Sequence, residues 1–196
     1  MSALHLAELA WYVTGRFYRT ATGALADYGY FLHLGGIEGD LFAGAKSEST
    51  AHFTFSAIPF FAHTVTNGAL SLGLDTIGEF SVYLQHTPAG DFHDPLSFAR
   101  GDCIGTFRRT SCVVGTTVNK GNSPTAHALI ASNVFSARLL SSTPFQFGGR
   151  HYDLRELLGV GVTQFGTAAG VAIVPPTTGY DAVVPFSGSA IRMGGH

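Results

Sequence analysis

The amino-acid sequence predicts an all-β protein, a single antiparallel β-barrel of about eight or nine strands with one or two short helices. Three observations support this fold class. Apolar and polar residues alternate with period 2 almost everywhere after residue 10, turn-forming pairs separate the alternating runs, and only 12% of the 196 residues are charged. A closed barrel removes the exposed strand edges that a β protein with so little charge struggles to protect. A β-sandwich is the alternative architecture.

The alternation is clearest in two stretches. In residues 50–57 one face is apolar and consists of Ala51, Phe53, Phe55 and Ala57. In residues 78–87 the apolar face consists of Phe80, Val82 and Leu84. This pattern is typical of a half-buried strand. Similar patterns predict further strands near residues 11–20, 28–34, 102–114, 127–140, 160–168 and 182–192.

Turn signals separate these strands and indicate how they connect. Asn67-Gly68 and Gly148-Gly149 each lie between two strand-like runs, which predicts a β-hairpin at each position. Helix is expected only at Ser2–Leu9 and at Asp153–Gly159, where Asp153 begins the helix and a glycine ends it. No linker or repeat interrupts the sequence, so residues 1–196 are expected to form one domain.

The low charge restricts the classes of partner. A net charge of −2 offers no basic face for nucleic acid, and no basic cluster is present for anionic lipid. Because a typical domain is about 25% charged, this composition favours a homo-oligomer or a closed, compact barrel. No apolar stretch reaches the roughly 18 residues that span a membrane. The N-terminal segment is a poor signal peptide, so a cytoplasmic location is expected.

The stretch PLSFARGDCIGTFRRTS, residues 95–111, holds the densest chemistry. Gly101 and Gly105 punctuate its predicted strand and precede the aromatic residue Phe107. In this respect it is similar to the allene oxide cyclase and dirigent group of calycin-type barrels. The resemblance implies a barrel that holds a hydrophobic small molecule and cyclises or binds it without a cofactor. It assigns no catalytic residue, because none of that group's catalytic positions can be matched to this sequence.

Other features of the same stretch have simpler interpretations. Alternation along the strand places Arg108 and Arg109 on opposite faces, which removes the apparent basic patch. Cys103 and Cys112 also point to opposite faces, so free thiols are expected rather than a disulfide. Arg100-Gly101-Asp102 is interpreted as a chance match to an adhesion tripeptide.

The motifs of common cofactor and metal enzymes are missing. The sequence has no G-x-S-x-G elbow, no P-loop, no glycine motif for a dinucleotide in the required context and no C-x-x-C. Its nine histidines include neither H-x-H nor H-E-x-x-H. We therefore predict neither a cofactor nor a metal site.

Candidate site residues are the polar side chains on otherwise apolar strand faces. A polar group left unpaired in a barrel interior costs about 1–3 kcal/mol, so such residues are expected to meet a partner or a ligand. They are His86, Arg109, Asn133 and Gln164.

Each candidate also has a purely structural interpretation. His86 can mark the end of its strand and reach solvent. Arg109, whose face includes Cys103, Gly105 and Phe107, can pair with Asp102 or Asp94. Asn133 and Gln164 can be satisfied core amides.

Two classes of function fit these residues. In the first, the protein is a cofactor-independent cyclase or isomerase of a hydrophobic, polyketide- or terpenoid-like molecule held in the barrel. His86 is then the acid or base, and Arg109 polarises a carbonyl or stabilises an enolate. The predicted substrate-binding residues are Tyr30, Phe107, Asn133 and Gln164. In the second class, the barrel binds or carries an apolar ligand and does no chemistry.

Overall fold

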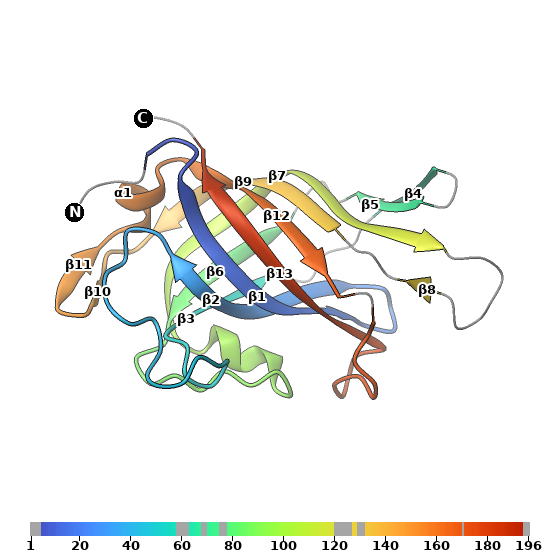
Figure 1. Cartoon of the computed structure of the whole chain (residues 1–196), viewed down its shortest axis with the longest axis horizontal. Coiled ribbons are helices and arrows are strands. Elements are labelled where there is room, and N and C mark those ends of the chain that lie inside the picture. The colour runs from blue at the N-terminus through green and yellow to red at the C-terminus, as the bar shows by residue number, and fades with distance from the viewer. Residues whose placement is uncertain are drawn as a thin grey trace.

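A computed structural model describes residues 5–57, 63–67, 70–74, 78–119, 127–128, 132–169 and 171–193. Eight antiparallel strands close into a barrel (Figure 1). The predicted fold class is therefore confirmed, and the alternative β-sandwich is wrong. Around the barrel they are β1 (Leu9–Arg19), β2 (Leu25–Leu34), β3 (Phe53–Ala57), β6 (Glu79–Leu84), β7 (Asp102–Asn119), β9 (Ser132–Ser142), β12 (Gly161–Ala168) and β13 (Ala182–Arg192). The β1–β13 pairing closes the ring.

Shorter strands extend the sheet beyond one end of the barrel. The hairpin of β4 (His63–Asn67) and β5 (Leu70–Leu74) pairs with the second half of β7, and β8 (His127–Ala128) pairs with its last two residues. The pairing of Asn67 with Leu70 confirms the predicted hairpin, although Gly68 lies outside the described residues.

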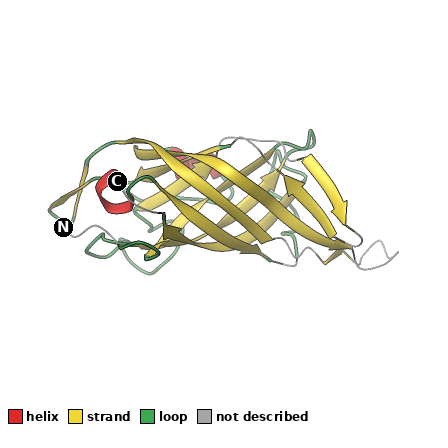
Figure 2. Cartoon of the chain, turned by 90° about the horizontal axis from the view of Figure 1, so that it is seen from above, coloured by secondary structure: helices red, strands yellow, loops and turns green. Residues whose placement is uncertain are grey.

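The other end of the barrel is covered by the segment between β9 and β12. It contains β10 (Phe145–Phe147), β11 (Arg150–Tyr152) and α1 (Leu154–Leu158), and Figure 2 shows the helix at this end. Glycines with positive φ join β10 to β11, and Asp153 caps the helix by accepting from the Arg155 backbone at 2.7 Å. The hairpin at Gly148-Gly149 and the helix at Asp153–Gly159 are thus confirmed. No helix in the described ranges has the length and apolar character needed to cross a membrane.

The helix predicted over Ser2–Leu9 is wrong for the residues that the structure describes. Residues 5–8 form a turn, and Leu9 begins β1. The backbone of Ala7 donates to the Arg192 carbonyl, and the Arg192 backbone donates to the Glu8 carbonyl. These two bonds pair the segment with the end of β13, so its backbone continues the β1–β13 ladder in place of a helix.

The barrel interior is packed mainly with aromatic rings. Trp11 meets Phe31 and Phe107 edge to face, with centroids 5.7 and 5.6 Å apart. Gly15 and Gly29 face each other across β1 and β2. A β-carbon at Gly29 would lie 2.2 Å from the Thr14 carbonyl oxygen, so this position has no room for a side chain.

A second apolar cluster lies outside the barrel wall, under the segment that contains the 3-10 turn η1 (Pro95–Ala99). It includes Tyr18, Tyr28 and Phe98, all buried. The Tyr18 hydroxyl donates to the Phe92 carbonyl at 3.0 Å. The covering segment is therefore attached to the wall by packing and by a buried hydrogen bond.

Raising the pH above 10 is expected to destabilise this cluster. Burial raises the pKa of Tyr28 to about 12 and also raises that of Tyr18, both from an ordinary value of 10.0. Because the folded state favours the neutral phenols, their contribution to stability is complete below pH 10 and is lost as the pH rises toward 12. Urea unfolding monitored by circular dichroism across this range measures the loss. In Tyr28→Phe the free energy of unfolding should fall less steeply with pH. An equally steep fall in both proteins would contradict the burial of the Tyr28 phenol.

Candidate functional site

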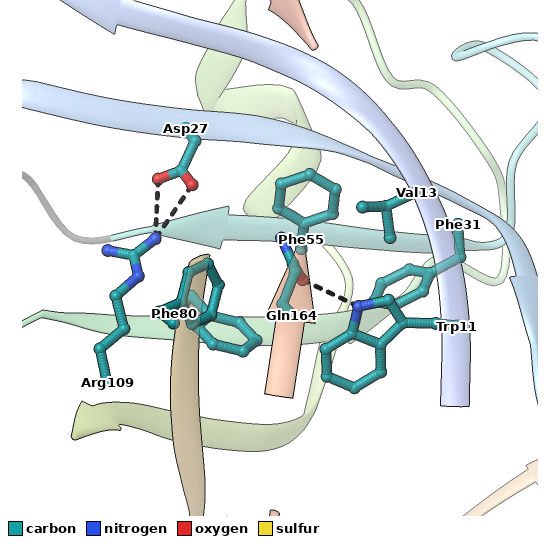
Figure 3. A pocket seen from close by; sticks show the side chains of 9 residues that line it. Trp11, Val13, Asp27, Phe31, Phe55, Phe80, Arg109 and Gln164 are labelled. Carbon is teal, nitrogen blue, oxygen red and sulfur yellow. Dashed lines mark hydrogen bonds and ion pairs between the residues drawn. The ribbon is translucent and has the colours of Figure 1, made fainter. Parts of the chain in front are cut away.

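The candidate site is a small set of polar side chains inside the aromatic barrel (Figure 3). Along β7 the side chains of Phe107 and Arg109 point inward, and both are buried. Arg108 points outward and donates to Glu79 at 2.7 Å, so the predicted separation of the two arginines is confirmed. Cys103 is predicted to lie on the same face as Phe107 and Arg109, and this prediction is wrong. A register shift between Val82 and Tyr83 moves it outward, where it is a free, exposed thiol.

Arg109 forms an ion pair with Asp27 of β2 across the barrel interior. Nη2 of Arg109 donates to both carboxylate oxygens of Asp27, at 3.2 and 3.0 Å. The two side chains are only 3% and 7% exposed. The guanidinium also lies over the ring of Phe135, with Cζ 4.9 Å from the ring centroid. The pair is thus neutral as a unit and enclosed by apolar rings.

The predicted partners of Arg109 are engaged elsewhere. Asp94 accepts from Arg100, and Asp102 pairs with His86, both on the surface. The alternative, structural interpretation in which Arg109 pairs with Asp102 or Asp94 is therefore wrong. The inward direction of Arg109 brings it to Asp27, which β2 presents from another part of the wall.

Gln164 of β12 points into the same interior and accepts a hydrogen bond from Trp11. The Trp11 indole Nε1 donates to Oε1 of Gln164 at 2.9 Å. Both residues are buried, so the bond fixes the indole plane among its aromatic neighbours. The prediction that Gln164 faces the interior is confirmed.

Asn133 of β9 also faces inward and is buried. Its amide lies over Gly166 of β12, where a β-carbon would be 2.2 Å from Oδ1. Oδ1 has no hydrogen-bond partner in the part of the chain that the structure describes. The glycine therefore makes room for the amide, and the amide adds an acceptor to the polar set.

A cavity of about 20 Å³ lies between these groups. This volume holds about one water molecule. Two of the polar pairs border it, Asp27 with Arg109 and Trp11 with Gln164, and the remaining lining is apolar. The lining residues are Trp11, Val13, Asp27, Phe31, Phe55, Phe80, Arg109, Phe135 and Gln164.

Two predicted site residues lie away from this interior. β6 ends at Leu84, so His86 lies outside the barrel with its side chain 68% exposed, and it pairs with Asp102 at 2.9 Å. The interpretation of His86 as a strand-end residue that reaches solvent is confirmed, and its expected place on the inner face is wrong. Tyr30 points outward from β2 between the rings of Phe42 and Phe92, where burial raises its pKa.

Asp27 and Trp11 are the interior residues that the sequence prediction missed. Asp27 is the single carboxylate on a face that continues through Gly29 and Phe31, which is the signal used for the other candidates. The predicted strand begins at residue 28, so its inner face does not include Asp27, whereas β2 begins at Leu25. Trp11 lacks such a signal, because an aromatic residue on an apolar face is ordinary core.

Replacing His86 with alanine is expected to leave the barrel interior unchanged. An exposed ion pair contributes little, so the free energy of unfolding should change by less than about 0.5 kcal/mol. Chemical denaturation followed by Trp11 fluorescence measures both stability and the interior environment. A shifted emission maximum in the folded variant would show that His86 does influence the interior.

The described residues bring no three histidine, cysteine, aspartate or glutamate side chains together in a group that could hold a metal ion. The interior instead offers a fixed cation, a carboxylate and two amides in apolar surroundings. No family model, no curated protein and no solved structure matches this chain. The structure shows a closed, eight-stranded antiparallel barrel, and no comparison supports the resemblance to the allene oxide cyclase and dirigent group.

Proposed function

We propose that the barrel interior binds a small hydrophobic molecule that carries a carbonyl or carboxylate oxygen. One observation carries this proposal, the Asp27–Arg109 pair, which is more than nine-tenths buried beside a cavity with aromatic walls. Burying two charges is costly even when they pair, so such a pair is weak evidence for stability alone. Apolar pockets with a few fixed polar groups are the usual architecture of small-molecule sites.

The size of the cavity determines how binding takes place. A volume of about 20 Å³ admits no hydrophobic molecule, so a ligand must displace side chains from the lining. The rings of Phe80 and Phe135 flank the Arg109 guanidinium and are the natural groups to move. Binding should therefore rearrange the surroundings of the indole, because Phe80 lies edge to face with Trp11 at 6.2 Å.

Trp11 makes this proposal directly testable, because it is the only tryptophan in the sequence. The probes are a medium-chain fatty acid, the methyl ketone of the same length and the matching alkane. We expect the acid or the ketone to change Trp11 emission saturably and to raise the melting temperature, and the alkane to do neither. Ligand bound only to the folded state stabilises it by mass action.

Two variants separate the pair from nonspecific charge effects. The paired replacement Asp27→Leu with Arg109→Met removes both buried charges together and should abolish the preference for the oxygenated probes. The matched control Arg108→Gln changes the outward neighbour of Arg109 and should bind as the unmodified protein does. Equal loss in the two variants, or no response to either oxygenated probe, would overturn the proposal.

A second candidate function is a cofactor-independent isomerase or cyclase, favoured by the carboxylate beside the fixed cation. Asp27, rather than the exposed His86, is then the acid or base, and Arg109 stabilises the enolate as charge develops. A β,γ-unsaturated ketone is a suitable probe. Asp27 takes a proton from the α carbon, Arg109 holds the enolate oxygen, and the proton returns at the γ carbon to give the conjugated isomer.

The conjugated product absorbs more strongly in the ultraviolet, so the reaction can be followed directly. We expect Asp27→Asn to abolish the absorbance increase and Arg108→Gln to preserve it. Trp11 emission shows whether Asp27→Asn remains folded. If the unmodified protein is no faster than Asp27→Asn, the catalytic function is excluded while binding stands on its own test.

A further inference from the structure

Within the part of the chain that the structure describes, no segment covers the outer face of four neighbouring strands, β9, β12, β13 and β1. In Figure 1 the strands β1, β13 and β12 cross the front of the barrel with no other segment over them. The outward side chains of these strands that lie away from the segment containing η1 are those of Leu9, Tyr12, Thr14, Ser132, Val134, Ser136, Arg138, Leu140, Thr163, Phe165, Thr167, Ser187, Ser189 and Ile191. We call this set the bare face. Arg138 is its only charged member. Arg16 and Tyr18 of β1 also point outward, but they pack against that segment, with the Arg16 guanidinium 4.2 Å from the ring centroid of Phe92.

The opposite part of the barrel wall is covered by another segment of the chain. Thr54 and Gln85 point outward around β3 and β6, yet both are buried, because the segment that contains η1 covers them. The Thr54 hydroxyl donates to the Phe98 carbonyl at 2.6 Å, and Gln85 Nε2 donates to the Ser97 carbonyl at 3.0 Å. The bare face has no such cover among the described residues, although it exposes Phe165, Tyr12 and several aliphatic side chains.

The bare face combines exposed rings with a depression. Phe165 is 48% exposed, and Tyr12, Val134 and Leu140 are about as exposed. Beside Phe165 and Tyr12 lies a depression of about 390 Å³ whose floor includes Gly166 and Gly188. A projecting ring next to a hollow large enough for a ring is self-complementary, because two copies related by a twofold axis can each insert a ring into the other.

We propose that the bare face associates with the bare face of a second copy of this chain. The near absence of charge on the bare face favours a second copy as its partner. It contains no acidic residue and a single arginine, so two copies meet with almost no charge to desolvate. A nucleic acid or an anionic membrane would require a basic cluster that the face does not contain.

The size of the face sets the strength of the contact. Seven residue pairs join β12 to β13, and at about 3.3 Å per residue and 4.8 Å per strand the four strands present roughly 450 Å². A standard interface buries about 800 Å² per partner. The dimer should therefore be weak and concentration-dependent, in reversible equilibrium with the monomer.

Sedimentation velocity from about 1 μM to about 1 mM tests the proposal, since this range brackets a weak dimer. We expect the weight-average mass to rise toward that of two chains. Phe165→Asp should raise the dissociation constant at least tenfold, because two carboxylates would then be forced into an apolar contact. The control is Leu96→Asp, which adds the same charge at a residue of η1 that is 63% exposed. It should associate as the unmodified protein does.

Each outcome bears on the proposal. A monomer across the whole range overturns it, and so does a dimer that Phe165→Asp and Leu96→Asp weaken equally. Flotation with neutral phosphatidylcholine vesicles at the same concentrations identifies a lipid occupant, which would also overturn it. Circular dichroism tests whether Phe165→Asp is folded, which we expect because residue 165 points outward. The result does not depend on the interior site, since neither variant alters an interior residue.

Discussion

Replacing Arg109 with methionine is expected to lower the free energy of unfolding by about 3–5 kcal/mol. The variant keeps a long apolar side chain between Phe80 and Phe135 but leaves the Asp27 carboxylate without its partner in the interior. The loss arises from the uncompensated charge and not from missing volume. Urea unfolding followed by Trp11 fluorescence measures it, and the melting temperature should fall by roughly 6–20 °C.

The paired replacement Asp27→Leu with Arg109→Met is the internal control for this result. Removing both charges together should restore most of the lost stability, since a buried ion pair is often no better than apolar residues of similar volume. The coupling free energy from the double-mutant cycle then reports the interaction itself. Additive losses in the two single variants would show that the charges act independently and would contradict the ion pair.

Truncation of Phe107 to alanine should have an effect of similar size, about 3–5 kcal/mol. Its ring is fully buried, stacks on Phe80 with centroids 4.9 Å apart and meets Trp11 edge to face. Alanine would leave a cavity that the surrounding strands cannot close. Denaturation followed by circular dichroism measures the loss, while Trp11 emission reports whether water enters.

The matched control for Phe107→Ala is Phe165→Ala, which removes the same ring from the outer face of β12. Because Phe165 is about half exposed, its truncation should cost less than about 1 kcal/mol. Similar losses at the two positions would contradict the assignment of Phe107 to the interior. Phe107→Leu should lie between the two, since leucine fills part of the space.

Local sequence patterns were sufficient to predict the fold. The alternation of Phe80, Val82 and Leu84 is reproduced as the inner face of β6, and the glycine pair at 148–149 forms the expected hairpin. Such features are determined by neighbours in the sequence, because side-chain direction alternates strictly along a strand. The same rule placed Phe107, Arg109, Asn133 and Gln164 in the interior.

The prediction failed where the answer depended on strand ends and on distant partners. Continuing the alternation past Leu84 predicts an inward His86, but β6 ends at Leu84. The partner of Arg109 lies 82 residues away, on β2, and no local pattern identifies it. Tyr30 points outward because the inner face of β2 passes through Gly29 and Phe31 instead.

The closure of the ring by β1 and β13 has a consequence for folding. Every other barrel strand pairs with a neighbour that is close in sequence, whereas these two are separated by almost the whole chain. Contacts of such long sequence separation form slowly, because the intervening chain must first be ordered. During synthesis, one edge of β1 therefore lacks its backbone hydrogen-bond partners until β13 has been made. Until then the nascent barrel is an open sheet, and its exposed edge is the point at which aggregation would begin.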